Sequence, residues 1–376
     1  MSTGTYKPPF PYFGGKSQVA HLVWDAIGAD CPNVVEPFFG SGAVLFLRPG
    51  GAGAIETIND ADGFVANFWR ALQRDPEAVA LAADNPVNEC DLHARHLWLL
   101  GQRELITDRL CGDPDFYDAK AAGWWCWGMC CWIGGGWCTG QGPWQSVDGV
   151  MTNTRATENG VWRQLPQLGD AGQGVNRKRP HLADAGKGVN RQRPHLGDAG
   201  QGVNRQLPHL GNSGQGVNRQ RPQSGSLREY LQGFADRLAN VRVCCGDWSR
   251  VCGPSVTFRH GMTGVFLDPP YADTAGRASD LYAVDCQQVA HRVREWAIEQ
   301  GANPLMRIVL AGYDGEHEMP ADWRCHEWAT LGGYASQAEG GRAGTGNYAK
   351  ERLWFSPACL KLKADPQRDL FEEAVA

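Results

Sequence analysis

The chain has 376 residues, a net charge of -5 and 42% hydrophobic residues, which is enough for a large α/β domain with an insert or for two domains. No apolar run is long enough to span a bilayer and no secretory signal opens the sequence, so we expect a cytoplasmic protein without a membrane segment. The 13 cysteines include no Cys-x-x-Cys pair, and we therefore expect reduced thiols and no metal site.

The charge is distributed unevenly along the chain. Residues 151–228 carry 12 Lys and Arg against 4 Asp and Glu, whereas the remaining residues carry 24 against 37. An acidic body with one basic segment is typical of a catalytic domain with a separate arm for a polyanion. A solvated basic linker is the alternative that composition leaves open.

A glycine-containing loop, PFPYFGGKS at residues 9–17, comes first. Two glycines follow aromatic residues, and Lys16 opens an amphipathic helix. Backbone NH groups of such a loop, together with Lys16, can meet a carboxylate or phosphate. The spacing does not fit a P-loop, and a simple turn before a helix is the alternative.

The next segment, VVEPFFGSGAV at residues 34–44, predicts a short strand that ends at Glu36, a Gly-Ser-Gly turn and a helix from Ala43. Small residues let the backbone approach a ligand there, as in nucleotide sites, although the absence of GxGxxG disfavours a dinucleotide. A second strand ends at Asp60, where a carboxylate can bond ribose hydroxyls, and Asp62 is a candidate cap for the helix that follows.

Residues 76–110 indicate packing helices, and residues 123–144 are rich in tryptophan: Trp124, Trp125, Trp127, Trp132, Trp137 and Trp144. Tryptophan rings can stack on nucleobases or wedge between them, and they also fill protein cores. We favour core packing and leave base contact open for at least one ring.

Four copies of a fourteen-residue unit run from Gln167 to Pro222, and a degenerate copy precedes them, which gives a repeat region at residues 153–222. Each unit has little apolar content, so it needs stacking, a host domain or a ligand to be ordered. One Asn-Arg pair recurs per unit: Asn176-Arg177, Asn190-Arg191, Asn204-Arg205 and Asn218-Arg219. Such side chains can hold phosphate or contact base edges, and a flexible or purely structural array is the alternative.

After the repeats, residues 227–238 predict an amphipathic helix, and a strand from Val241 leads into Gly-Asp-Trp. There Asp247 can bond the amino group of an adenine while Trp248 packs against its face. A helix at residues 287–298 and buried strands at 307–312 and 351–355 follow.

The strand at residues 265–267 stops abruptly at Asp268-Pro269-Pro270-Tyr271, because proline cannot donate to a ladder and restricts the residue before it. Ligand sites in open α/β sheets lie outside such strand ends. The Asp268 carboxylate and the Pro269 carbonyl can hold a planar amine by its two hydrogens while Tyr271 stacks on its ring. Methyl transfer to an exocyclic amino group needs this arrangement; a strand-ending turn with a solvated Asp is the alternative.

In content and order these motifs resemble those of the Dam-like DNA adenine-N6 methyltransferases, the D12 class. The resemblance rests on PYFGGK, VEPFFGSGAV, TINDAD, CCGDW and FLDPPY, and it covers residues 8–72 and 227–357. It implies a Rossmann-like α/β fold dependent on S-adenosyl-L-methionine, with a catalytic domain at 1–118 and 227–376. Residues 119–226 would be a target-recognition insert, in which the fourteen-residue repeats depart from the family pattern.

The resemblance further implies methyl transfer from S-adenosyl-L-methionine to N6 of a flipped-out adenine in double-stranded DNA. The implied cofactor residues are Tyr12, Lys16, Glu36, Pro37, Gly40, Ser41, Gly42, Asp60, Asp247 and Trp248. The implied catalytic residues are Asp268, Pro269, Pro270 and Tyr271, and the repeat pairs are the candidate DNA contacts. The alternatives are an N4-cytosine DNA methyltransferase and a catalytically silent DNA-binding repeat protein on a methyltransferase scaffold. A monomer and a homodimer, and a restriction-modification or an orphan enzyme, fit the sequence equally.

Overall fold

The structure, a computed structural model, describes residues 7–12, 15–50, 55–132, 136–139, 144–147, 150–153, 224–270, 288–328 and 351–362. Tyr271 and the repeat region beyond Asn153, with its four Asn-Arg pairs, lie outside the described residues. The helices are α1 (Ala20–Ile27), α2 (Ala43–Phe46), α3 (Gly63–Arg74), α4 (Pro76–Ala83), α5 (Glu89–Gly112), α6 (Ala119–Cys131), α8 (Ser224–Leu238) and α9 (Val289–Gly301). The strands are β1 (Asn33–Glu36), β2 (Ile55–Asp60), β3 (Trp144–Val147), β4 (Val150–Asn153), β5 (Val241–Cys245), β6 (Thr263–Leu267), β7 (Met306–Tyr313), β8 (Arg324–Trp328) and β9 (Glu351–Phe355).

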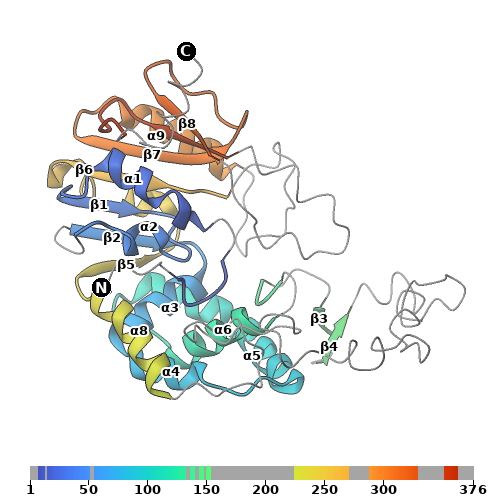
Figure 1. Cartoon of the computed structure of the whole chain (residues 1–376). Coiled ribbons are helices and arrows are strands. Elements are labelled where there is room, and N and C mark those ends of the chain that lie inside the picture. The colour runs from blue at the N-terminus through green and yellow to red at the C-terminus, as the bar shows by residue number, and fades with distance from the viewer. Residues whose placement is uncertain are drawn as a thin grey trace, which may run out of the picture.

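A seven-stranded sheet has the order β5-β2-β1-β6-β7-β9-β8 (Figure 1). The strands from β5 to β7 are parallel, and β9 is antiparallel to both of its neighbours. The strand order reverses between β1 and β6, which makes the carboxyl ends of these two strands the topological switch point of the sheet. The expected α/β architecture is therefore present around this point.

Helices cover both faces of the sheet. Alternate residues of the central strands point to opposite sides, so each face contributes side chains to a separate core. Val34 of β1 and Phe266 of β6 pack with α1 on one face. Val35 and Val265 pack with α9 on the other. The two strands are buried along their whole length, as central parallel strands are, so side chains become accessible only past their ends.

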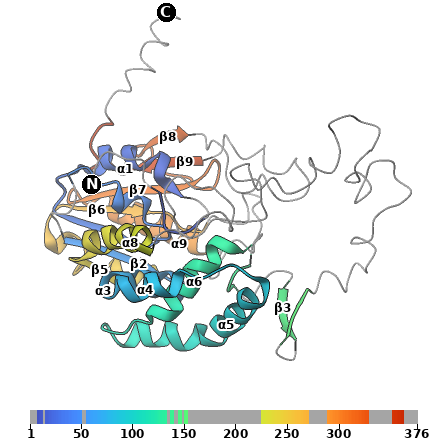
Figure 2. The same ribbon diagram turned by 60° about the horizontal axis from the view of Figure 1, so that its bottom comes forward.

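A helical layer formed by α3, α4, α5, α6 and α8 lies beside β2 and β5 (Figure 2). In the tryptophan-rich segment, Trp125 and Trp127 of α6 and Trp137 are buried in the core that this layer shares with the sheet. These three rings therefore pack in the core, as favoured from the sequence. Trp124 and Trp132 are partly buried against the same core.

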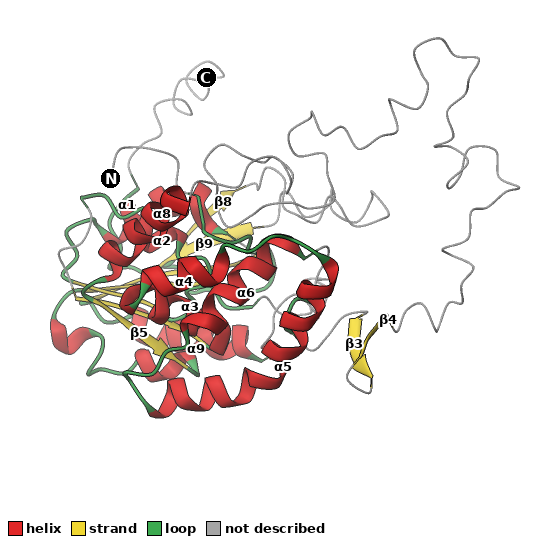
Figure 3. Cartoon of the chain, turned by 90° about the horizontal axis from the view of Figure 1, so that it is seen from below, coloured by secondary structure: helices red, strands yellow, loops and turns green. Residues whose placement is uncertain are grey.

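Two strand features were not expected from the sequence. β3 and β4 form a two-stranded hairpin (Figure 3). β8, at the edge of the main sheet, alternates half-buried with exposed residues and is mostly polar. A short polar edge strand lacks the apolar run by which the central strands are recognised.

Helix α8 is attached to the sheet by a buried ion pair. Arg237 donates two hydrogen bonds to Glu56 of β2, at 2.6 and 2.7 Å, and Arg48 donates a third at 2.8 Å. Glu56 is 2% exposed, so its charge depends on these partners.

We expect Arg237→Met to lower the free energy of unfolding by about 3 kcal/mol, the low end for breaking a buried ion pair, because Arg48 remains on Glu56. The matched control is Arg228→Met on the same helix, which removes an exposed pair with Glu77 and should cost less than about 1 kcal/mol. Urea unfolding of the three proteins measures both values. Equal losses for the two variants would contradict the assignment.

Candidate functional site

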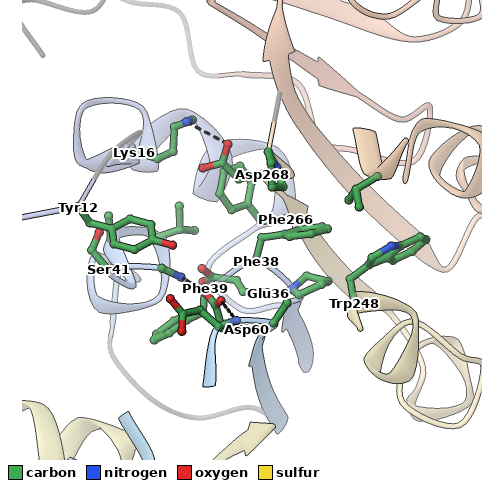
Figure 4. A pocket seen from close by; sticks show the side chains of 18 of the residues that line it. Tyr12, Lys16, Glu36, Phe38, Phe39, Ser41, Asp60, Trp248, Phe266 and Asp268 are labelled. Atoms are coloured by element: carbon green, nitrogen blue, oxygen red, sulfur yellow. Dashed lines mark hydrogen bonds and ion pairs between the residues drawn. The ribbon is translucent and has the colours of Figure 1, made fainter. Parts of the chain in front are cut away.

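A cavity of about 240 Å³ opens at the switch point, at the carboxyl ends of β1, β2, β5 and β6. The predicted site residues that line it are Tyr12, Lys16, Glu36, Pro37, Gly40, Ser41, Asp60, Asp247, Trp248, Asp268 and Pro270. In Figure 4, Lys16 and Asp268 lie at the top of this cavity, Asp60 lies below, and Tyr12 and Trp248 flank it. Segments far apart in the chain thus meet in one place.

Two predicted residues are close to the cavity without lining it. Gly42 precedes α2 with a φ of 76°, and a Cβ there would collide with Phe39 and Phe46. Pro269, in the turn after β6, is buried. Gly40, which lines the cavity, has a φ of 49°, and a Cβ on it would overlap the Tyr12 ring. Glycine is therefore required twice in the turn, as the Gly-Ser-Gly pattern predicts.

The end of β2 holds the neighbouring loops together. The Asp60 carboxylate accepts the backbone NH of Gly40 at 2.9 Å on one oxygen and that of Asp62 at 2.9 Å on the other. The Asn59 amide donates to the carbonyls of Pro37, at 3.1 Å, and Gly246, at 2.9 Å. The β1 and β5 loops are thus fixed to β2 on either side of it.

Two carboxyl groups in the cavity have strongly raised pKa values. Burial raises the pKa of Glu36 to about 8, and the nearby Glu56 and Asp268 add to the effect against the opposing charge of Arg237. Glu36 is 2% exposed, and its Oε1 has no hydrogen-bond partner. Burial, with the charge of Asp62, also raises the pKa of Asp60 to about 7. A nearby positive charge would lower both pKa values, so the cavity favours a cationic ligand.

Asp62 has the capping role that the sequence predicts, since its side chain accepts the NH of Phe64 at 2.9 Å. It also meets Arg103 of α5 at 3.5 Å, and Arg103 donates in turn to the Cys138 carbonyl. The rim of the cavity is thereby connected to the tryptophan-rich segment.

Asp268 is paired with Lys16 across the cavity. The Lys16 ammonium lies 3.0 Å from Asp268 Oδ1 and 3.8 Å from Glu351 Oε2 of β9, and the lysine is only 3% exposed. The sequence predicts that Lys16 meets a carboxylate or phosphate of a ligand; its ion-pair partners in the structure are two carboxylates of the protein. The N-terminal loop and the Asp-Pro-Pro-Tyr turn are thus held face to face.

The other end of the cavity is aromatic. Phe38 and Trp248 are nearly parallel, with centroids 6.4 Å apart and an angle of 29°. Asp247 lies beside Trp248; burial tends to raise its pKa, but the hydroxyl and NH of Ser249 and the charge of Arg292 outweigh this and hold the pKa below its usual value. A carboxylate acceptor next to flat rings suits a planar heterocycle with an amino group.

Several lining residues were missed by sequence reasoning, in particular Val289 and Arg292 of α9. The helix itself is recognisable, but nothing in its periodicity tells which turn faces the end of another strand. Phe38, Phe39 and Phe266 also line the cavity. They lie inside motifs that the sequence had already singled out.

Among the described residues, no cluster of three His, Cys, Asp or Glu side chains is arranged to hold a metal ion. No helix in the described part of the chain is long and apolar enough to cross a membrane. The twelve cysteines within it are free thiols.

A mixed α/β fold with a seven-stranded sheet, and a cavity at its switch point, is compatible with a methyltransferase fold. Residues 12–93 match the family model described as D12 class N6 adenine-specific DNA methyltransferase. This match confirms the resemblance drawn from the motifs and supports an enzyme of that type. It includes the residues from Tyr12 to Asp60 and ends before the Asp-Pro-Pro-Tyr motif. No curated protein sequence matches the chain.

The raised pKa of Glu36 predicts a pH-dependent stability. Between about pH 4.5 and 8 the folded protein keeps a proton that the unfolded chain has lost, so the free energy of unfolding falls as the pH rises through this window. The slope from this group is at most about 1.4 kcal/mol per pH unit. The glutamine of Glu36→Gln is neutral in both states, so this variant should show a smaller slope of the free energy of unfolding against pH.

Urea unfolding at several pH values between 5 and 8 tests this expectation. Glu77→Gln is the matched control, because Glu77 is 73% exposed and should leave the slope unchanged. Asp60 contributes in the same direction, so a reduced slope rather than a flat one is expected. An unaltered slope in Glu36→Gln would exclude the buried acid as its source.

Proposed function

We propose that this protein transfers the methyl group of S-adenosyl-L-methionine to N6 of an adenine in double-stranded DNA, with the base flipped out of the duplex into the space beside Asp268. The family match supports adenine methylation of DNA in general. The finer proposal is supported above all by one observation, that Asp268 of the Asp-Pro-Pro-Tyr motif lines the same cavity as Gly40 and Ser41 of the glycine-rich turn.

The donors and acceptors of the cavity fit such a cofactor. The unpartnered Oε1 of Glu36 can accept a hydrogen bond from a cationic amino group, and its carboxylate favours positive charge. Asp60 would accept ribose hydroxyls on lone pairs beyond those used by Gly40 and Asp62. Asp247 and Trp248 would hold the adenine, and Tyr12 and Lys16 would flank the amino-acid part. The bound cofactor supplies an electrophilic methyl group on a sulfonium.

The protein's contribution to the reaction is to orient the target amine. The two N6 hydrogens would be accepted by the Asp268 carboxylate and the Pro269 carbonyl, which favours a more tetrahedral nitrogen with its lone pair towards the methyl group. Pro270 stiffens the turn, and Tyr271 is proposed to stack on the base, which is worth about 1–3 kcal/mol. Such positioning can contribute up to about 7–11 kcal/mol to the lowering of a barrier.

Lys16 must share or release Asp268 when the target base enters. Its ammonium lies 3.0 Å from Asp268 Oδ1, one of the two carboxylate oxygens available to the N6 amine. The ammonium can remain close to Glu351, already 3.8 Å away, when the amine takes its place. The ion pair therefore marks the position where a hydrogen-bond donor is expected in the complex.

DNA binding is assigned to the basic insert, because the rest of the chain is acidic. The candidate contacts are the repeat pairs Asn176-Arg177, Asn190-Arg191, Asn204-Arg205 and Asn218-Arg219. An N4-cytosine methyltransferase remains the chemical alternative, since its amine is equivalent. Nucleoside analysis of DNA incubated with the protein and S-adenosyl-L-methionine tests the main proposal. N4-methylcytosine in place of N6-methyladenine would refute it, and so would unmodified DNA.

We expect Asp268→Ala to abolish methyl transfer, because one of the two acceptors for the amine is lost, while cofactor affinity stays within about threefold of the wild type. Methylation with labelled cofactor and calorimetric titration of the cofactor measure the two effects. Asp314→Ala, at an exposed carboxylate after β7, is the control and should methylate normally. Turnover retained by Asp268→Ala would remove this residue from the chemistry.

Deletion of residues 181–208, two complete repeats, should weaken DNA binding and reduce the slope of log affinity against log salt. The deleted segment carries six Lys, Arg and His side chains against two carboxylates, so fewer phosphate contacts would remain. Cofactor titration serves as the control for intact folding. An unchanged salt slope would assign the array a spacer role.

A further inference from the structure

The aromatic end of the cavity has a cation that the motifs do not account for. Val289 and Arg292 lie three positions apart in α9 and therefore on one face, and both line the cavity. The Arg292 guanidinium lies over the Trp248 ring, 6.0 Å from its centroid. Trp296, one turn further along, meets Trp248 edge-on at 5.9 Å. The first turns of α9 thus close this end of the cavity.

The hydrogen bonds of Asp247 leave one side of its carboxylate available. Ser249 donates twice to Oδ1, from its NH at 3.0 Å and from its hydroxyl at 2.5 Å. No described residue bonds Oδ2. Arg292 acts on Asp247 electrostatically but forms no ion pair with it, so the two charged groups remain available on the wall of one cavity.

Such a pair matches one edge of adenine. Adenine presents an amino donor next to a ring nitrogen that accepts, on either side of the amino group. A carboxylate only accepts and a guanidinium only donates, so the two side chains have the complementary order. A purine with an oxygen in place of the amino group would place this acceptor next to the carboxylate, which is also an acceptor, so no hydrogen bond would form.

We propose that Arg292 is a specificity-determining residue that, paired with Asp247, recognises the amino edge of the cofactor's adenine by donating to the ring nitrogen beside N6. The inference rests on the proposed use of S-adenosyl-L-methionine. It differs from a packing role, in which the arginine only covers the Trp248 face.

Calorimetric titration with S-adenosyl-L-homocysteine, which needs no turnover, tests the proposal. Arg292→Met should weaken binding about 10- to 100-fold, the effect of losing a charged hydrogen bond, and Arg292→Lys should recover part of the loss. Arg259→Met, at an exposed arginine before β6 and outside the cavity, is the matched control and should bind as the wild type does. Thermal melting verifies that each variant is folded.

Two altered ligands separate recognition from packing. The 1-deaza analogue of S-adenosyl-L-homocysteine lacks N1, and the 7-deaza analogue lacks N7, so one of them lacks the acceptor assigned to Arg292. Arg292→Met should affect that analogue less than threefold, because its partner atom is already missing. A loss of the same size for all three ligands, or no loss for any, would overturn the proposal. Failure of the wild type to bind S-adenosyl-L-homocysteine and S-adenosyl-L-methionine would instead refute the proposed function.

Discussion

The site depends on the hydrogen bonds at the carboxyl end of β2. The Asn59 amide and one oxygen of Asp60 fix the backbone on either side of the strand, at Pro37, Gly40 and Gly246, and the other oxygen of Asp60 holds the NH of Asp62. Parallel strands alone would bring these loops to one edge of the sheet without fixing their backbone. Because these bonds are partly or fully buried, they are stronger than they would be in water.

The cavity contains a buried acid, Glu36, whose pKa is raised by its surroundings. Glu36 is buried deeply enough to retain a proton at neutral pH, and the neighbouring carboxylates oppose its ionisation. A cationic ligand would stabilise the ionised form of Glu36 and lower its pKa, and this interaction would favour binding of the cation. The charge distribution has a second consequence for the proposed function: an acidic body would repel DNA, so attraction of the duplex is assigned to the basic residues between 151 and 228.

Lys16 and Asp268 connect the two halves of the proposed chemistry. One belongs to the segment before α1 and the other to the turn after β6, and both line the cavity that the glycine-rich turn also lines. An ammonium held at 3.0 Å offsets part of the cost of keeping a carboxylate partly buried. In the proposed reaction, the Asp268 carboxylate would accept a hydrogen bond from the target amine in place of the lysine.

The sequence by itself determined the strand-end motifs, because their signals are local. A glycine is needed where φ is positive, as at Gly40, and a proline after an apolar run ends a strand, as at Pro269. Only the tertiary structure decided which side chains from elsewhere complete the cavity. Arg292 lies over Trp248, and Lys16 forms an ion pair with Asp268. The rotation of the helix and the order of the strands bring these residues together, and their spacing in the sequence does not reveal the contacts.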